Sequence, residues 1–178
     1  MVSKCPFGLQ MQRIMAEIIS KSPQVKDYLK VRYIGSVSNN TITSMHGDEE
    51  AQENLRQICI REEQSDKYWE YVSCFMKEGK SADCLNSSTV DEVEINACAR
   101  ERGRGLTYAQ KDFDLGNKFN ITGSPTLTLN NKIVSEFDFA TNTTSARSPE
   151  AIKELLCCGF NKEPSFCAGR DSTIGCYK

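Results

Sequence analysis

Val2-Ser3-Lys4-Cys5-Pro6-Phe7-Gly8 decides the fold, because it places a cysteine at the start of the first predicted helix. Apolar residues recur after it at three- and four-residue spacing, which predicts an amphipathic helix from about Pro6 to Ile19. Cys5 then occupies the N-cap, and Pro6 the first helical position, where a missing N–H has no cost. The helix N-terminus and Lys4 favour the thiolate form, which makes Cys5 the candidate nucleophile. The alternative is that Cys5 is only a small buried hydrophobic residue.

Length and charge exclude several classes of protein. The chain has 178 residues and a net charge of −2, enough for one domain with a hydrophobic core but cramped for two. It has no lysine-rich run, so neither nucleic acid nor an anionic membrane is expected as a partner. No apolar run approaches the about 18 residues of a membrane span, and no signal-peptide pattern opens the chain. We therefore expect a single domain over residues 1–178.

The sequence contains nine cysteines, far more than usual for this length. If all except Cys5 form structural disulfides, Cys5 is left as the single thiol, but spacing alone does not determine the pairing. Cys157 and Cys158 are adjacent, and because a disulfide between them would be strained, each is expected to pair elsewhere. Close ligand pairs are missing and the only histidine is His46, so no metal site and no cofactor are predicted. The disulfide candidates are Cys59, Cys74, Cys84, Cys98, Cys157, Cys158, Cys167 and Cys176.

Disulfides indicate an oxidising compartment, which would be extracellular, lysosomal or periplasmic if an N-terminal signal is missing from this chain. The cytosol of a hyperthermophile is the alternative, and the sequence leaves both open. Glycosylation sequons would suit a secreted eukaryotic protein, although such motifs are also frequent by chance. They begin at Asn39, Asn86, Asn120 and Asn142.

Hydrophobic periodicity divides the rest of the chain into strands and helices. Alternation over Leu29–Val37 predicts a strand, and residues 48–119 read as an inserted subdomain of helices tied by internal disulfides. Three of its helices are expected over about residues 48–63, 65–78 and 107–119. A further helix is expected to begin at Ser88 or Thr89, with Val93, Ile95 and Cys98 facing inward. A hairpin around Asn130-Asn131 and a last helix from Ser148 to Gly159 complete the pattern.

This order of elements is that of an α/β (α+β) chain with a thioredoxin-like fold divided by a helical insertion. Such a fold has a central strand before its first helix, and here only Met1 to Ser3 remain of that strand. We therefore expect a truncated first strand and a shortened N-terminus, which would also explain why no signal peptide is seen.

Several motifs now resemble those of known redox proteins. Cys5-Pro6-Phe7-Gly8 is similar in position to the Cys-X-X-Cys motif of thioredoxin-like and DsbA-like oxidoreductases, and Thr122-Gly123-Ser124-Pro125 resembles their cis-proline loop. His46-Gly47 followed by Glu50, Asn54 and Cys59 resembles most of the signature of gamma-interferon-inducible lysosomal thiol reductases. The spacing of Cys157 and Cys167 resembles the C-terminal cysteine pair of that family, which favours a disulfide between them.

The resemblance implies a thiol-disulfide oxidoreductase with Cys5 as its catalytic residue. Polypeptide substrates, unfolded or disulfide-containing, would contact Pro6, Phe7, Ser124 and Pro125. Lys4 and His46 could assist the thiol, although for His46 a structural role in the turn before the next helix is favoured over proton transfer.

The chain departs from the family pattern at three positions. Ser44 and Ala51 stand where the pattern has cysteines, which suggests the loss of one disulfide. Gly8 stands where the second active cysteine belongs, so the enzyme is expected to form mixed disulfides that an external thiol such as glutathione resolves. Two alternatives remain: a non-catalytic peptide-binding or chaperone-like module, and a metal or cluster carrier using Cys5 of two chains.

Overall fold

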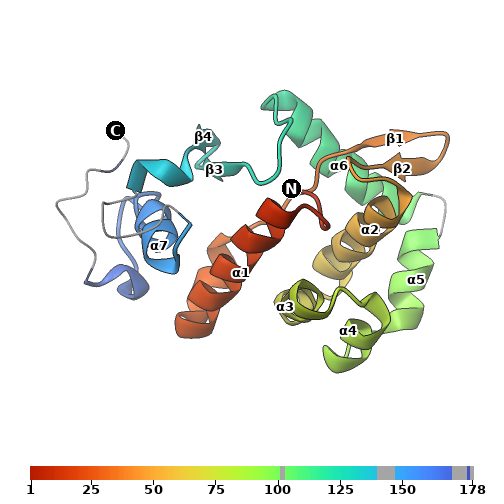
Figure 1. The fold of residues 1–178 in the computed structure, drawn as a ribbon, viewed down its shortest axis with the longest axis horizontal. Helices are drawn as coiled ribbons and strands as arrows, with labels where there is room; N and C mark the ends of the chain where they lie inside the picture. Colours follow the sequence, from red (N-terminus) through yellow and green to blue (C-terminus); the bar gives the residue numbers. More distant parts are fainter. Residues whose placement is uncertain (101–102, 140–146, 170–175, 177–178) are drawn as a thin grey trace. The chain divides into compact units, whose positions relative to one another are not determined.

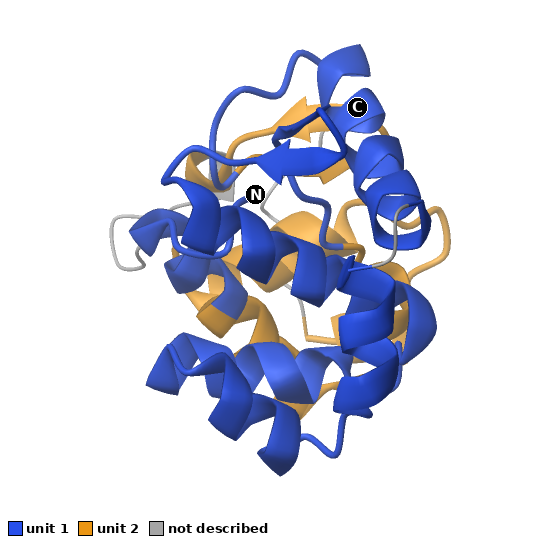
Figure 2. Cartoon of the chain, turned by 90° about the vertical axis from the view of Figure 1, so that its right-hand side faces the viewer, with its two compact units in different colours: residues 1–12, 31–125 blue, residues 13–30, 126–178 orange. Residues whose placement is uncertain are grey.

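The computed structural model describes residues 1–100, 103–139, 147–169 and 176, and shows a helix-rich α+β protein with small antiparallel sheets (Figure 1). The α+β class expected from the sequence is thus confirmed. The chain divides into two compact units (Figure 2). Unit 1 contains residues 1–12 and 31–125, and unit 2 contains residues 13–30 and 126–178. The sequon at Asn142 lies outside the described residues.

Helix α2, Asp48–Glu63, is the central helix of unit 1 and has the bounds that the sequence predicts. It contacts α3 (Tyr68–Glu78), α5 (Glu92–Arg100) and α6 (Arg104–Lys118), while α4 (Ser81–Ser87) packs against α3 (Figure 1). Because neighbours surround α2, its buried residues include polar as well as apolar side chains. The buried polar ones recur at helical spacing and so share one face: Glu50, Glu53, Asn54 and Gln57.

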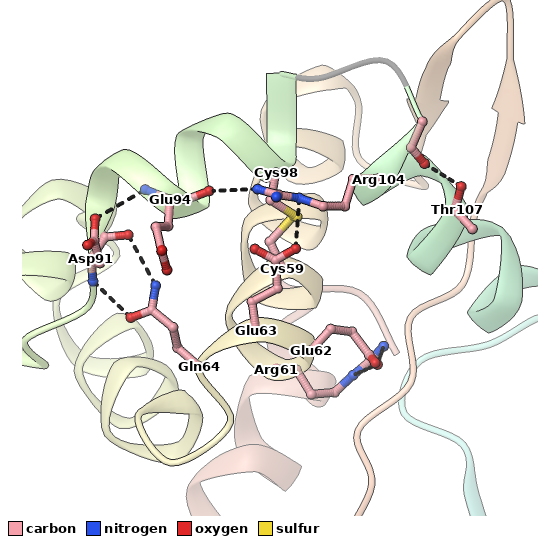
Figure 3. The surroundings of a disulfide bond; sticks show 11 residues. Cys59, Arg61, Glu62, Glu63, Gln64, Asp91, Glu94, Cys98, Arg104 and Thr107 are labelled. Carbon is pink, nitrogen blue, oxygen red and sulfur yellow. Dashed lines mark hydrogen bonds and ion pairs between the residues drawn. A yellow bond between two sulfur atoms is a disulfide. The ribbon is translucent and has the colours of Figure 1, made fainter.

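Each unit contains its own disulfides. Within unit 1, Cys59–Cys98 joins α2 to α5, as Figure 3 shows, and Cys74–Cys84 joins α3 to α4. Within unit 2, Cys157 bonds to Cys167 and Cys158 bonds to Cys176. Cys5 is the free cysteine.

The strand expected over Leu29–Val37 is mostly wrong. Only Ser36–Ser38 forms a strand, β1, and it pairs in antiparallel fashion with β2, Thr41–Thr43. The turn of this hairpin is made by Asn39 and Asn40, which have positive φ angles of 51° and 59°. The apolar residues before β1 are nevertheless buried, because Tyr33 and Ile34 lie in an extended segment of the core.

The chain start pairs with that extended segment. The Met1 nitrogen donates to the Arg32 carbonyl at 2.7 Å, and the Ile34 N–H donates to the Met1 carbonyl at 3.0 Å. These two bonds follow the pattern of neighbouring parallel strands. Val2 and Ser3, which follow, are fully buried.

Two predictions about the helical region are wrong in detail. Asp91, rather than Ser88 or Thr89, caps α5, because its Oδ1 accepts from the Glu94 N–H at 3.1 Å. Val93, predicted to face inward, is instead 79% exposed, because it precedes the buried Ile95 by two residues and so lies on the opposite side of the helix. Ile95 and Cys98 are buried as predicted, whereas α4 was not expected.

Unit 2 contains the hairpin and last helix that the sequence predicts. Strands β3, Leu127–Leu129, and β4, Lys132–Val134, are joined by a turn at Asn130 and Asn131, with φ angles of 49° and 65°. Helix α7, Pro149–Cys157, is capped by Ser148, whose side chain accepts from the Ala151 N–H at 3.1 Å. It ends before Gly159, and its Ala151 and Leu155 pack against the hairpin.

The remaining elements are short or span the division between the units. Helix α1 runs from Pro6 to Lys21, so the boundary between Gln12 and Arg13 lies inside it. Three short 3-10 helices belong to unit 2 among the described residues: Pro23–Tyr28, Glu136–Phe139 and Ser165–Cys167. Over the described part of the chain, no helix combines the length and apolar character needed to cross a lipid bilayer.

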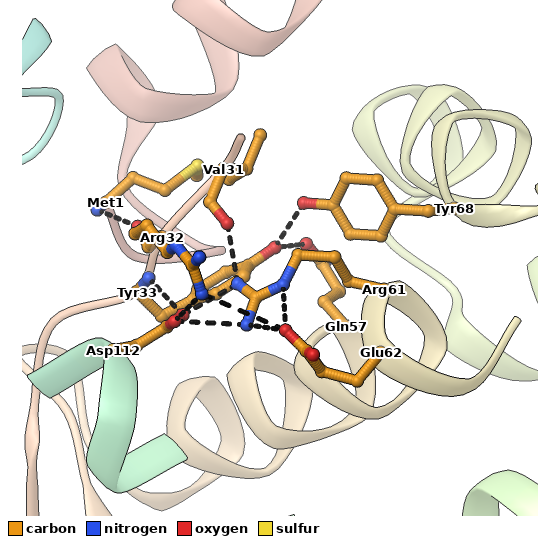
Figure 4. A network of polar contacts seen from close by, with 9 residues as sticks. All are labelled: Met1, Val31, Arg32, Tyr33, Gln57, Arg61, Glu62, Tyr68 and Asp112. Carbon is orange, nitrogen blue, oxygen red and sulfur yellow. Dashed lines mark hydrogen bonds and ion pairs between the residues drawn. The ribbon is translucent and has the colours of Figure 1, made fainter. Parts of the chain in front are cut away.

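A buried carboxylate holds the extended segment against α2 and α6 (Figure 4). Asp112 of α6 accepts from Arg61 of α2 at 2.7 and 3.0 Å, from the Arg32 side chain at 2.8 Å and from the Tyr33 N–H at 3.0 Å. Burial alone would lower the pKa of Arg61, but the hydrogen bond and charge of Asp112 outweigh it and raise that pKa. The Arg61 guanidinium therefore stays charged in its buried position.

Replacing this carboxylate should destabilise the protein. We expect Asp112→Ala to lower the free energy of unfolding by about 3 kcal/mol, because it removes the buried partner of the Arg61 guanidinium and leaves only the partly exposed Glu62 to pair with it. Urea denaturation followed by circular dichroism measures the change. The matched control is Asp114→Ala on the exposed side of the same helix, expected to change stability by less than about 0.5 kcal/mol. Equal effects of the two substitutions would contradict the assigned role.

Candidate functional site

The candidate site centres on Cys5, which lies directly before the first residue of α1. Its Sγ lies 3.2 Å from the backbone oxygen of Ser124, to which the thiol donates, and the Ser124-Pro125 peptide bond is cis. The side chain is 7% exposed and packs in a cluster with Val2 and Ile34. The structure therefore brings Cys5 and Ser124 together, although they are 119 residues apart in the sequence.

The other predicted residues around the thiol are on the surface. Pro6 and Phe7 are exposed on the first turn of α1. Lys4 points its ammonium group at Glu49, with Nζ 2.5 Å from Oε2. This ion pair is exposed to solvent, so it contributes little to stability.

Gly8 occupies a confined position beside Cys5. A Cβ atom at Gly8 would lie 2.8 Å from the Ser124 Oγ and 3.2 Å from the Val2 carbonyl oxygen. The Ser124 hydroxyl is held there by the Val2 N–H, which donates to it at 3.0 Å. A hydroxyl group thus lies against the position where the Cys-X-X-Cys motif has its second cysteine.

The buried carboxylate of Glu50 fixes the backbone before Cys5. Its Oε2 accepts from the Lys4 N–H at 3.0 Å and from Nδ1 of His46 at 2.7 Å. Its Oε1 accepts from the Ser44 hydroxyl at 2.7 Å and the His46 N–H at 3.1 Å. Burial by itself would raise the pKa of Glu50, but these hydrogen bonds outweigh it and hold the pKa below its ordinary value of 4.5.

Asn54, one helical turn after Glu50, holds the adjacent peptide group. Its Oδ1 accepts from the Ser3 N–H at 2.8 Å, and its Nδ2 donates to the Ser44 hydroxyl at 2.9 Å. The four-residue spacing places the two side chains on the same face of α2. Consecutive peptide groups at Ser3 and Lys4 are therefore bound by consecutive turns of one helix.

His46 and Gly47 shape the entry to that helix. Gly47 is the N-cap of α2 and has a φ of 90°, a conformation that favours glycine. Glu50, at the third helical position, reaches back to the His46 N–H in a variant of the capping box. These contacts support the structural role predicted for His46, and its ring also contacts the carboxylate that holds Lys4.

Sequence reasoning missed the role of the residues that hold Cys5 in place. In the sequence, Glu50 and Asn54 stand out only through the family resemblance, and Ser44 only as a position where the family pattern has a cysteine. The available signal is the four-residue spacing of Glu50 and Asn54, which places both on one face of the helix. This spacing does not predict their partners Lys4 and Ser3, which lie 46 and 51 residues earlier in the chain. Among the described residues, no group of three or more His, Cys, Asp or Glu side chains could hold a metal ion.

Comparison with known proteins gives one match. The family model described as gamma interferon inducible lysosomal thiol reductase (GILT) matches residues 1–102, more than half of the 178-residue chain. No curated protein and no solved structure matches the chain. The matched residues include Cys5, His46, Glu50 and Asn54.

The hydrogen bonds to Glu50 predict a pH-dependent contribution to stability. We expect Glu50→Gln to lower the free energy of unfolding by about 2 kcal/mol at pH 7, because one oxygen becomes an NH₂ group facing donors. Since the folded-state pKa of Glu50 is lowered, its contribution is present above pH 4.5 and lost as the pH falls through the lowered value. The difference between the two proteins should therefore shrink as the pH falls below 4.5.

Chemical denaturation at a series of pH values checks this expectation. Asp48→Asn is the matched control, because Asp48 is an exposed acidic residue in the same first turn of α2. A Glu50→Gln effect that is the same at low and neutral pH would show that the carboxylate charge is not responsible.

Proposed function

The chain belongs to the gamma interferon inducible lysosomal thiol reductase (GILT) family, and from this premise we propose that it is a thiol-disulfide oxidoreductase working through one thiol. The observation that carries the proposal is the state of the cysteines. Cys5 is free and lies against the Ser124 carbonyl, while every other cysteine is in a disulfide. Only Cys5 is therefore ready to act as a nucleophile.

In the proposed reaction, the Cys5 thiolate attacks one sulfur of a substrate disulfide. A bond forms between Cys5 and that sulfur, and the second substrate sulfur leaves as a thiolate and takes up a proton. Gly8 supplies no second thiol to resolve this mixed disulfide. A small thiol such as glutathione attacks the substrate sulfur and releases Cys5, and a second small thiol completes reduction of the substrate.

The geometry supports polypeptides as substrates. Loss of the Cys5 proton removes the donor that occupies the Ser124 carbonyl, and an N–H of an extended substrate chain can then bind there. Pro125 and the exposed Pro6 and Phe7 complete the proposed contact surface. The substrate class is therefore unfolded or disulfide-containing polypeptide.

We also propose a domain organisation for the chain and a compartment in which it acts. We take residues 1–178 as one thioredoxin-like domain with residues 48–119 inserted, a range in which the consecutive helices α2 to α6 support the interpretation. The disulfides are consistent with an oxidising compartment, and a lumenal site of action is proposed.

A second candidate function is a non-catalytic module that binds polypeptides. Two observations favour it: Gly8 replaces the resolving cysteine, and Cys5 is 7% exposed. A nucleophile has to be reached by its substrate, so limited access would lower the rate of reaction. The reactivity of Cys5 separates the two functions.

We expect a peptide disulfide to form a stable adduct on Cys5. Incubation with an excess of an oxidised peptide should add the mass of one peptide half to the intact protein, because no neighbouring thiol can release it. Addition of glutathione should remove the adduct. Intact-protein mass spectrometry measures both steps, and peptide mapping locates the modified cysteine.

Cys5→Ser is the control and should form no adduct. An adduct that disappears without added thiol would show that a second cysteine resolves it, which contradicts the monothiol mechanism. Alkylation of Cys5 by iodoacetamide no faster than that of a free cysteine peptide would favour the non-catalytic module. The monothiol enzyme is expected to react at least about tenfold faster, as for an activated thiol at neutral pH.

A further inference from the structure

A pocket of about 260 Å³ lies in unit 1 next to the cluster that contains the thiol. Its lining includes Ile34, which packs with Cys5, and Ile121, which packs against the same cluster. We propose that this pocket binds one apolar side chain of the polypeptide whose disulfide reacts with Cys5. The inference rests on the proposed function and adds which residues the site prefers beside the reacting cysteine of its substrate.

The chemistry of the lining determines the class of side chain. The residues that line the pocket are all uncharged. Met45 is the largely exposed apolar side chain among them, whereas Ile34 and Phe113 are almost fully buried. Asn117 and Thr122 supply the only polar side chains of the lining. A charged side chain would lose its hydration there without gaining a counter-ion, so an apolar one is favoured.

The position of the pocket connects it to the reacting chain. Thr122, on its lining, precedes by two residues the Ser124 carbonyl that contacts the Cys5 sulfur. A substrate bonded to Cys5 and lying along this loop would pass the pocket within a residue or two of its cysteine, since each extended residue spans about 3.3 Å. Continuity with the thiol site therefore identifies the substrate chain as the occupant.

The pocket is large enough for one side chain. Its volume of about 260 Å³ lies just below the about 300–1,000 Å³ of pockets for drug-sized ligands and cofactors. Met45 is a large hydrophobic residue that remains 58% exposed at the lining. Methionine is flexible and adapts to varied apolar partners, which suits an enzyme with several substrates.

Gly116 offers a way to fill the pocket from α6. It is a lining residue in α6, and a Cβ there would lie 3.3 Å from the Ile34 Cγ2. A leucine at this position would occupy pocket volume, and its side chain would favour the helix more than glycine does. Met45→Ser is the second variant, which removes apolar surface at an exposed position and so avoids overpacking the core.

The test compares two short peptides whose cysteine carries a 2-thiopyridyl group and is flanked by either leucine or serine. Attack by Cys5 joins it to the peptide sulfur and expels pyridine-2-thione, whose absorbance gives the rate constant. We expect the leucine peptide to react at least about tenfold faster, as for burial of an apolar side chain. Gly116→Leu and Met45→Ser should reduce this ratio, and Val93→Ser, a control at an exposed position outside the lining, should not.

Dithiodipyridine, which carries no side chain to place in the pocket, reports the reactivity of Cys5 itself. Its rate constant should be the same within about twofold in all variants. Equal rates for the two peptides, with normal reaction of dithiodipyridine, would overturn the pocket assignment and leave the proposed function intact. Failure of Cys5 to react with any of these disulfides would overturn the proposed function together with the inference.

Discussion

The buried carboxylate of Glu50 is the constraint on which the site depends. An ionised group in the protein interior is stable only when donors replace its water, and here they come from Ser44, His46 and the backbone of Lys4. The same contacts fix the peptide group that precedes Cys5. One side chain therefore holds both the turn before α2 and the segment before α1. Cys5 lies at the start of α1, yet its position is set by a residue of α2.

Glu50 is the first member of a polar face along α2. One and two turns later, Glu53 accepts from Tyr71 and Gln57 donates to Glu53, and Gln57 also accepts from Tyr33. At the end of this face Arg61 binds Asp112. The extended segment that pairs with Met1 is thus bound by the same helix that binds Ser3 and Lys4. Polar contacts along α2 thus place the chain around Cys5 and also join α2 to α3 and α6, while the Cys59–Cys98 disulfide joins it to α5.

The sequence predicts what depends on local chemistry. The acidic first turn and apolar stripe of α2 gave its bounds, and Ser148-Pro149 gave the start of α7. The Asn39-Asn40 turn carries the same signal as Asn130-Asn131, and all four strands have three residues. The apolar–polar alternation before the first turn begins already at Leu29, so it predicts a strand that starts too early. The hydrogen bonds from the Ser3 and Lys4 backbone to α2 join residues far apart in the chain. No local pattern encodes such partners, so the support of Cys5 emerges only from the structure.

The contact between Gly8 and Ser124 also limits how this chain could change. A side chain at position 8 meets the Ser124 hydroxyl, which the Val2 N–H holds in place. A cysteine at position 8 would therefore require the Ser124 hydroxyl to move and to give up its hydrogen bond with the Val2 N–H. A smaller residue at position 124 would remove that hydroxyl. An engineered dithiol version of this site is thus best begun as a double substitution at positions 8 and 124.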